Sequence, residues 1–411
     1  MRRITRIIAI TSINQLIVGL ACLEKNKKEN NSYNDYMIIN NILLSNDAVK
    51  SIKNTSKHFK FKKIIDFRKR LKWFNNWRNH STGKYNNILP AKIRMFVQLF
   101  INYKVEYYKS IKTITNDLIA LIGSDSVDEL YFRYKFNLPE QLLLHAFPSA
   151  DIYLFEDGLG DYIPKTNFEK VEKLSFEKQI VIRIKQIIHD YIRKDKTNPL
   201  KIDLSVYKRI KGIYELINNC EGWKKRLLVN NVPHEPIGIK NYYINILMEL
   251  KTGVFLDINN DGSIILLPSN YSAGKLWYPD KKWCSIDEEI IYIDQIIQSI
   301  EKLYPNNKII LKIHPRSPKY ISELYENNFG NKLKILHSSD YPGEILFLNN
   351  NVKAVVGGFS TSLIYSKNIF NLETYFAPVP GNGSTWFADQ TKIELIENTL
   401  INLGIKKLAL N

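Results

Sequence analysis

The sequence predicts an α/β protein made of two Rossmann-like domains. Its 411 residues are too many for one ordinary core and suit two domains of roughly 150–250 residues each. Short β-prone apolar runs alternate with segments of helical periodicity, which is typical of parallel sheets covered by helices. The two halves are similar in kind, so we expect a first domain over residues 1–255 and a second over residues 256–411.

The first half opens as a strand followed by a helix. The apolar run Ile7–Ile10 predicts a strand, and Ser12 is placed to cap a helix over Asn14–Glu24. Further strands are expected at Tyr36–Asn40, Ile64–Phe67, Glu129–Phe132 and Ile152–Phe155. The spacing of apolar residues predicts helices at Met95–Tyr107, Ile114–Ile122, Lys170–Arg193 and Tyr207–Asn218, with one more ending near Leu144. Tyr243–Met248 fits either kind of element.

The second half repeats this alternation. Buried strands are expected at Ile264–Pro268, Lys308–Ile313, Leu333–Leu336, Val352–Val356 and Thr374–Ala377. Helices are expected at Asp287–Tyr304, Lys319–Asn327, Pro342–Asn349 and Leu363–Lys367. These elements predict a second parallel sheet with helices of its own.

Composition indicates a folded and strongly basic chain. Hydrophobic residues make up 45% and charged residues 24%, a globular balance that argues against disorder. The 58 basic and 41 acidic residues give a formal net charge of +17, which attracts anionic partners. Much of the excess lies between Lys50 and Lys112, interleaved with aromatic residues. That segment fits a solvated helix face, an anionic membrane surface or nucleic acid.

Cysteine spacing and the lengths of the apolar runs argue against a disulfide-bonded, zinc-binding or membrane-spanning protein. Cys22, Cys220 and Cys284 are isolated, which argues against a disulfide framework or zinc site and fits a reducing compartment. The basic start and apolar Ile7–Ile10 mimic a signal peptide, but polar residues interrupt the apolar run and no clear cleavage site follows. No stretch of about 20 apolar residues would span a membrane.

Two adjacent carboxylates mark the end of the strand Ile152–Phe155. Glu156 and Asp157 follow directly, and Gly158 and Gly160 then allow a tight turn. Open α/β sheets bind ligands at the carboxyl ends of their strands. Paired carboxylates there are costly unless one of them holds or takes a proton. The stretch also fits a plain strand that ends in a polar turn.

Polar groups also follow strands of the second half. His314-Pro315 comes after Lys308–Ile313, where an imidazole could donate to a phosphate or protonate one. Gly357–Ser362 offers glycines and hydroxyls at a helix start, which suits either an anion site or an ordinary helix cap. Glu344 opens a short helix, where it could complement the helix dipole or accept both hydroxyls of a ribose.

Taken together and in this order, these residues resemble the three signature motifs of bacterial sialyltransferases. The resemblance is to the capsular polysialyltransferases and lipooligosaccharide sialyltransferases. It is carried by Glu156-Asp157-Gly158, by Lys312-Ile-His-Pro315 and by Ser360-Thr-Ser362. Ile10–Leu16 is similar to the first strand and turn of that group. Ser360-Thr361 stands where many members have two serines.

The resemblance implies a GT-B fold, with a cleft between an N-terminal acceptor-binding domain and a C-terminal CMP-donor-binding domain. It implies inverting transfer of sialic acid from CMP-sialic acid to a hydroxyl of a cell-surface glycan, in a capsule or lipooligosaccharide. No metal or other cofactor is implied, since the CMP-activated sugar is a substrate. The expected partners are CMP-sialic acid and a glycan acceptor. We expect a cytoplasmic protein with peripheral contact to the anionic inner-membrane surface, and no specific nucleic acid.

The resemblance also implies a role for each motif residue. Glu156 would be the general base, with Asp157 supporting it and serving as the alternative base. His314 would bind the donor phosphate and act as an acid toward it. Ser360 and Thr361 would hold the phosphate, and Glu344 would hold the ribose. The other expected substrate-binding residues are Gly158, Pro315, Ser362, Ser269 and Asn270.

Three other interpretations stay open on the sequence. The motifs fit donors in which CMP activates Kdo or another nonulosonic acid. A UDP-sugar transferase or a 2-epimerase would share the fold, although those enzymes usually carry a different nucleotide motif. A nucleic-acid-binding protein without enzymatic activity would use the basic segment between Lys50 and Lys112, but it would leave the three motifs unexplained.

Overall fold

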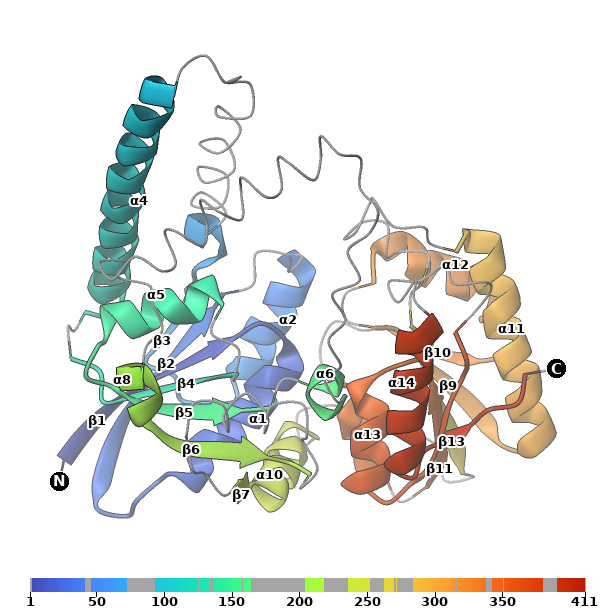
Figure 1. Ribbon diagram of the computed structural model, residues 1–411. Helices are drawn as coiled ribbons and strands as arrows, with labels where there is room; N and C mark the ends of the chain where they lie inside the picture. Colours follow the sequence, from blue (N-terminus) through green and yellow to red (C-terminus); the bar gives the residue numbers. More distant parts are fainter. Residues whose placement is uncertain are drawn as a thin grey trace.

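The computed structural model has two parallel sheets, one from each half of the chain, lying side by side (Figure 1). It describes residues 2–40, 46–71, 93–123, 126–133, 137–156, 158–163, 204–217, 236–251, 262–269, 271, 284–314, 317–337, 342–349, 351–379 and 390–410. Helices flank both sheets. The chain therefore has the predicted GT-B fold of two Rossmann-like domains.

The first sheet has seven strands in the order β3-β2-β1-β4-β5-β6-β7, and every pairing is parallel. Its strands are β1 (Arg2–Ile10), β2 (Asn31–Ile39), β3 (Lys63–Asp66), β4 (Glu129–Arg133), β5 (Asp151–Phe155), β6 (Ile210–Glu215) and β7 (Ile237–Gly238). Its helices are α1 (Ile13–Lys25), α2 (Asn46–Ser56), α4 (Ile93–Ile122), α5 (Leu138–Ala146), α6 (Leu159–Tyr162), α8 (Leu204–Lys208) and α10 (Lys240–Lys251). The strand order reverses between β1 and β4, the kind of point where open α/β sheets bind ligands.

The second sheet has six strands in the order β10-β9-β8-β11-β12-β13, again all parallel. Its strands are β8 (Ser263–Leu267), β9 (Lys308–Lys312), β10 (Lys334–Leu336), β11 (Val352–Gly357), β12 (Glu373–Phe376) and β13 (Lys406–Lys407). Its helices are α11 (Ile286–Leu303), α12 (Lys319–Phe329), the 3₁₀ helix η3 (Gly343–Leu348), α13 (Thr361–Asn368) and α14 (Gln390–Asn402).

Some predicted elements differ from those observed. The helix expected over Tyr207–Asn218 is wrong: α8 ends at Lys208, and the strand β6 follows. The two helices expected within residues 95–122 form the single helix α4, and Tyr243–Met248 belongs to α10. The helix predicted at Lys170–Arg193 and the domain boundary between residues 255 and 256 lie outside the described residues.

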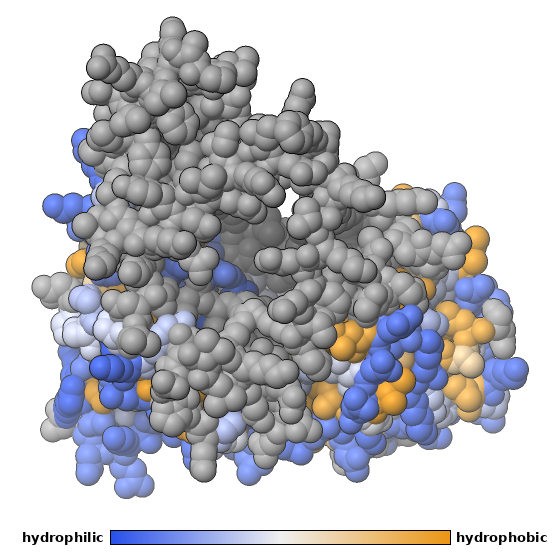
Figure 2. Space-filling model, in the orientation of Figure 1, coloured by the Kyte–Doolittle hydropathy of each residue, from blue (hydrophilic) through white to orange (hydrophobic). Residues whose placement is uncertain are grey.

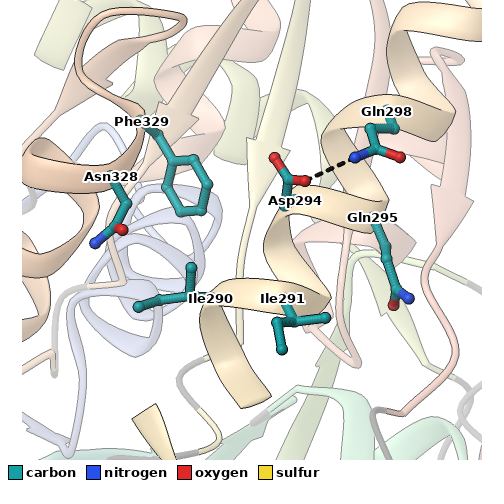
Figure 3. Close-up of a pocket in the computed structure, with 7 residues that line it drawn as sticks. All are labelled: Ile290, Ile291, Asp294, Gln295, Gln298, Asn328 and Phe329. Atoms are coloured by element: carbon teal, nitrogen blue, oxygen red, sulfur yellow. Dashed lines mark hydrogen bonds between the residues drawn. The ribbon is translucent and has the colours of Figure 1, made fainter. Parts of the chain in front are cut away.

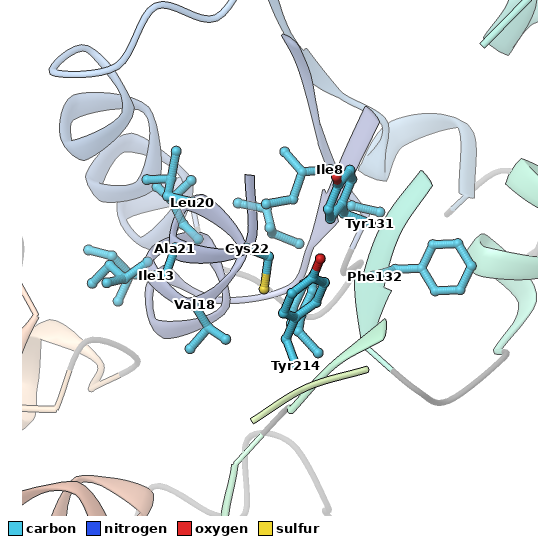
Figure 4. Close-up of a cluster of buried hydrophobic side chains, with 14 of the residues drawn as sticks. Ile8, Ile13, Val18, Leu20, Ala21, Cys22, Tyr131, Phe132 and Tyr214 are labelled. Carbon is cyan, nitrogen blue, oxygen red and sulfur yellow. The ribbon is translucent and has the colours of Figure 1, made fainter. Parts of the chain in front are cut away.

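Helix α1 shows how the first domain is built. Ser12 caps it as predicted, because the Ser12 side chain accepts a hydrogen bond from the Gln15 N–H at 3.2 Å. The helix is buried along most of its length, among side chains from β1, β4 and β6 (Figure 4). Gly19 lies against the Ile8 side chain so closely that a Cβ there would overlap it. The close packing fixes the helix start at the carboxyl end of β1.

The two domains share part of their apolar core. Buried residues of α10, which follows the first sheet, cluster with residues of η3 and α13 from the second half. The rings of Tyr243 and Tyr365 meet edge to face with centroids 5.6 Å apart. A second cluster lies within the second domain, around α11 and α12. Among the described residues, no helix is long and apolar enough to cross a membrane.

Asp35→Ala is expected to lower the free energy of unfolding by about 3 kcal/mol, because it would leave a buried guanidinium without its carboxylate. Arg6 is fully buried and binds both Asp35 oxygens, at 2.6 and 2.7 Å. Urea unfolding measures the change. Arg2→Ala, in the exposed pair with Asp128, is the control and should barely change stability. Equal losses in the two variants would contradict the prediction.

Candidate active site

The acidic motif and the hydroxyl motif meet where the two domains touch. Glu156 follows β5 and Ser360 caps α13 after β11, so both lie at carboxyl ends of central strands. The Leu159 N–H donates to Thr361 Oγ1 at 2.8 Å. Gly158 has φ +131°, and a Cβ there would lie 2.6 Å from Thr361 Oγ1. Glycine is therefore required at 158 both by the backbone and by the opposite domain.

Glu156 is only 1% exposed, and hydrogen-bond donors from both domains surround its carboxylate. The hydroxyls of Tyr162 and Tyr365 donate to Oε1 at 2.7 and 2.6 Å. The Leu216 N–H donates to Oε2 at 2.9 Å. Tyr365 belongs to α13, so the second domain holds the proposed base of the first. These bonds compensate for the desolvation of a buried carboxylate.

Tyr365 connects Glu156 to a wider polar network. Burial, and then the charge of Glu156, raise the pKa of Tyr365 well above its usual value, so the phenol stays protonated. The Asn14 amide donates to the Tyr365 hydroxyl oxygen at 3.4 Å, and the Tyr243 hydroxyl donates to Asn14 Oδ1 at 3.5 Å. Sequence reasoning missed Tyr162, Tyr243 and Tyr365 as parts of the site. Only the four-residue spacing of Thr361 and Tyr365, which places both on one helix face, offered a signal.

The hydroxyls at the start of α13 differ in what they can still donate. Ser360 Oγ accepts from the Ser362 N–H at 3.2 Å, and Thr361 Oγ1 accepts from Leu159. Both keep their O–H proton without an acceptor among the described residues. Ser362 Oγ instead donates to Glu344 Oε1 at 2.6 Å. Ser360 and Thr361 are thus the pair that can donate to an anion at this helix N-terminus.

Glu344 lies buried at the first turn of η3, beside Ser362. Burial raises the pKa of its carboxyl, and the Ser362 hydrogen bond and the nearby charge of Lys312 only partly offset that effect. Lys312 is itself buried and donates to the His337 carbonyl at 3.2 Å. The Ser362 hydroxyl thus occupies one of the two Glu344 oxygens, Oε1, as an acceptor.

Glu344→Gln is expected to become more stable relative to the wild type as pH rises. Below the unfolded pKa both side chains are neutral, so the two proteins should melt alike. As pH rises through the raised folded pKa, the wild type must ionise a buried carboxyl and loses the stability that the protonated form contributed. Melting temperatures between pH 4 and 8 check this expectation. A difference that shrinks as pH rises would contradict it.

Other predicted site residues lie along the same sheet edge. His314 is exposed just after β9. Ser269 follows β8, close enough to Gly358 that a Cβ on Gly358 would overlap it. Because β8 lies between β9 and β11, all three strands end at one edge. Asp157, Pro315 and Asn270 lie outside the described residues.

A separate hollow lies on the outer helices of the second domain. It has a volume of about 440 Å³ and lies between α11 and α12 (Figure 3). It contains none of the motif residues. Hydrophobic side chains are scattered among hydrophilic ones on the visible face of this domain (Figure 2). Neither feature belongs to the candidate site.

Several solved structures are similar to this chain at low sequence identity. The UDP-bound MnaA structure of S. aureus is similar at 10% identity and TM-score 0.47, covering 98% of this chain and 88% of that one. A Photobacterium 2,6-sialyltransferase with CMP and lactose has 14% identity and TM-score 0.47, covering 99% and 78%. The E. coli heptosyltransferase WaaC has 10% identity and TM-score 0.40, covering 97% and 99%.

A search of curated proteins gave no match. A family model does match, and it spans both domains and all three motifs. Its description is alpha-2,8-polysialyltransferase, and it matches residues 6–247 and 263–377. The chain belongs to the alpha-2,8-polysialyltransferase family.

Proposed function

We propose that this protein is an inverting glycosyltransferase that moves sialic acid from CMP-sialic acid to a hydroxyl of a cell-surface glycan. Family membership supports sialyl transfer. The observation that carries the rest is that α13 of the second domain bonds to the first domain at the acidic motif, where Thr361 accepts from the Leu159 N–H and Tyr365 donates to Glu156. Both contacts belong to one short helix, whose N-terminus would bind the donor phosphate.

On the donor side, the second domain neutralises the phosphate of the departing CMP. Ser360 and Thr361 have hydroxyl protons available, and the N-terminal dipole of α13 adds positive potential. His314 contributes an exposed imidazole at the same sheet edge and can protonate the leaving phosphate. A leaving group that already carries a phosphate needs charge stabilisation more than covalent catalysis.

On the acceptor side, Glu156 removes the proton of the attacking hydroxyl. A sugar hydroxyl is a poor nucleophile and needs a base within hydrogen-bonding distance. Donors such as Tyr162, Tyr365 and the Leu216 N–H cover the carboxylate, so the acceptor hydroxyl must replace one of them. Asp157, the next residue, is the alternative base.

The basic surface suits anionic partners of this reaction. Lys57, Lys60 and Lys62 are exposed between α2 and β3, and Lys63 is exposed at the start of β3. Donor, sialylated glycan and inner-leaflet lipid all carry negative charge, so we include peripheral contact with the cytoplasmic membrane surface in the proposal.

CMP release from CMP-sialic acid, with and without galactose- and sialic-acid-terminated acceptors, tests the proposal. Acceptor-dependent release would support it and identify the acceptor class. Turnover only with CMP-Kdo or another CMP-nonulosonate would keep the mechanism and change the sugar. Turnover only with UDP-sugars, or none with any CMP-sugar, would refute the function.

A further inference from the structure

Helix α13 carries two kinds of polar contact one turn apart. At its start, Ser360 and Thr361 have hydroxyl protons that no described acceptor takes. One turn later, Tyr365 donates to Glu156 Oε1 at 2.6 Å. Residues four apart share a helix face, and both Thr361 and Tyr365 bond to the first domain. The same short helix therefore links the proposed phosphate site to the proposed base.

The Tyr365 hydroxyl is held in one orientation. Its side chain is fully buried and packs edge to face on the Tyr243 ring. Its oxygen accepts from the Asn14 amide, so its single proton points to Glu156. Asn14 is in turn bonded by Tyr243. A shift of α13 would therefore move a fixed donor relative to the carboxylate.

We propose that Tyr365 is a positioning residue that couples occupation of the α13 N-terminus by the donor phosphate to the orientation of the Glu156 carboxylate. This inference rests on the proposed function, which places the phosphate at Ser360 and Thr361 and makes Glu156 the base. Coupling between two sites is reciprocal. If donor binding holds α13 against Glu156, the bond from Tyr365 to Glu156 also strengthens donor binding. Tyr365 then contributes to CMP affinity through α13.

Tyr162 provides a matched control. Its hydroxyl donates to the same oxygen, Glu156 Oε1, at 2.7 Å. It lies on α6 in the first domain, so Tyr162→Phe removes a comparable bond without changing α13. Both phenylalanine variants keep the aromatic ring and its packing. A difference between them therefore isolates the link to the second domain.

The experiment measures kcat for transfer from CMP-sialic acid and the Kd for CMP by calorimetry, in wild type, Tyr365→Phe and Tyr162→Phe. Both variants are expected to lower kcat about tenfold, because each removes a hydrogen bond to a charged group. Only Tyr365→Phe is expected to raise the CMP Kd, by about fivefold or more. Asn14→Ala removes the amide that orients the Tyr365 hydroxyl, so it should also raise the CMP Kd. This variant replaces Tyr365→Phe in the test if Tyr365→Phe folds poorly.

Equal CMP Kd values in the two tyrosine variants would overturn the proposal. A Tyr365→Phe enzyme as fast as the wild type or faster would also overturn it. The hydroxyl would then have no effect on the transfer rate, or would slow transfer by blocking the carboxylate. Failure of the proposed function looks different. A wild type that neither binds CMP nor transfers sialic acid refutes the function, whereas an active wild type matched by Tyr365→Phe refutes only the coupling.

Discussion

Glu156→Gln is expected to lower the rate of sialyl transfer by about 10²–10⁴-fold, the usual contribution of a positioned general base. An amide cannot take the proton of the acceptor hydroxyl. The exchange keeps the side-chain size, and the amide oxygen can still accept from the Leu216 N–H, but an amide nitrogen cannot accept from Tyr162 and Tyr365. CMP release with acceptor present measures the loss, and the melting temperature checks that the variant is folded.

Asp157→Asn is the matched comparison for Glu156→Gln. If Asp157 only supports the base, its amide variant should retain more activity than Glu156→Gln under the same conditions. A larger loss in Asp157→Asn, with Glu156→Gln still active, would assign the base to Asp157. Glu156 would then be a structural carboxylate between the domains, a role that its burial and its hydrogen bonds would also fit.

Gly158→Ala is expected to reduce both stability and transfer. The residue has φ +131°, where a non-glycine residue costs about 1–3 kcal/mol. The new methyl group would lie 2.6 Å from Thr361 Oγ1, so either the Thr361 side chain must rotate or α13 must move away from the first domain. Either change would disturb the bond from Leu159 to Thr361. Urea unfolding and CMP-dependent transfer measure the two effects.

Gly123→Ala separates backbone strain from the contact between domains. Gly123 has φ +74°, and nothing lies within 4 Å of a Cβ built there. Its alanine variant should lose stability through strain alone and keep its transferase activity. If Gly158→Ala transferred sialic acid as fast as Gly123→Ala does, the contact between Gly158 and Thr361 would not matter for transfer, and the prediction would be wrong.

Most strands could be predicted because a buried parallel strand is a short apolar run with a clear end. The runs before Glu156, before His314 and before Gly357–Ser362 are of this kind, and the structure places strands there. The prediction failed at β6. Ile210, Ile213 and Ile217 have helical spacing, yet parallel pairing of residues 210–214 with β5 outweighs that local preference.

The motif residues were found from the sequence, but their partners were not. Carboxyl ends of parallel strands meet at one edge, so local sequence is enough to gather residues such as Ser269 and Ser360. Tyr162 lies only six positions from Glu156, but Tyr365 reaches it only because α13 packs against the first domain. That packing depends on contacts between residues up to 209 positions apart, which no local pattern records.

The apolar core that α10 shares with η3 and α13 is expected to couple the unfolding of the two domains. Melting either domain would expose buried side chains of the other, including Leu363 and Ile345 on the donor side. The whole chain should therefore lose its structure in a single transition. A second domain produced alone would present that apolar face to water and associate with itself. The three motifs would thus belong to a single folding unit, although the chain has the architecture of two domains.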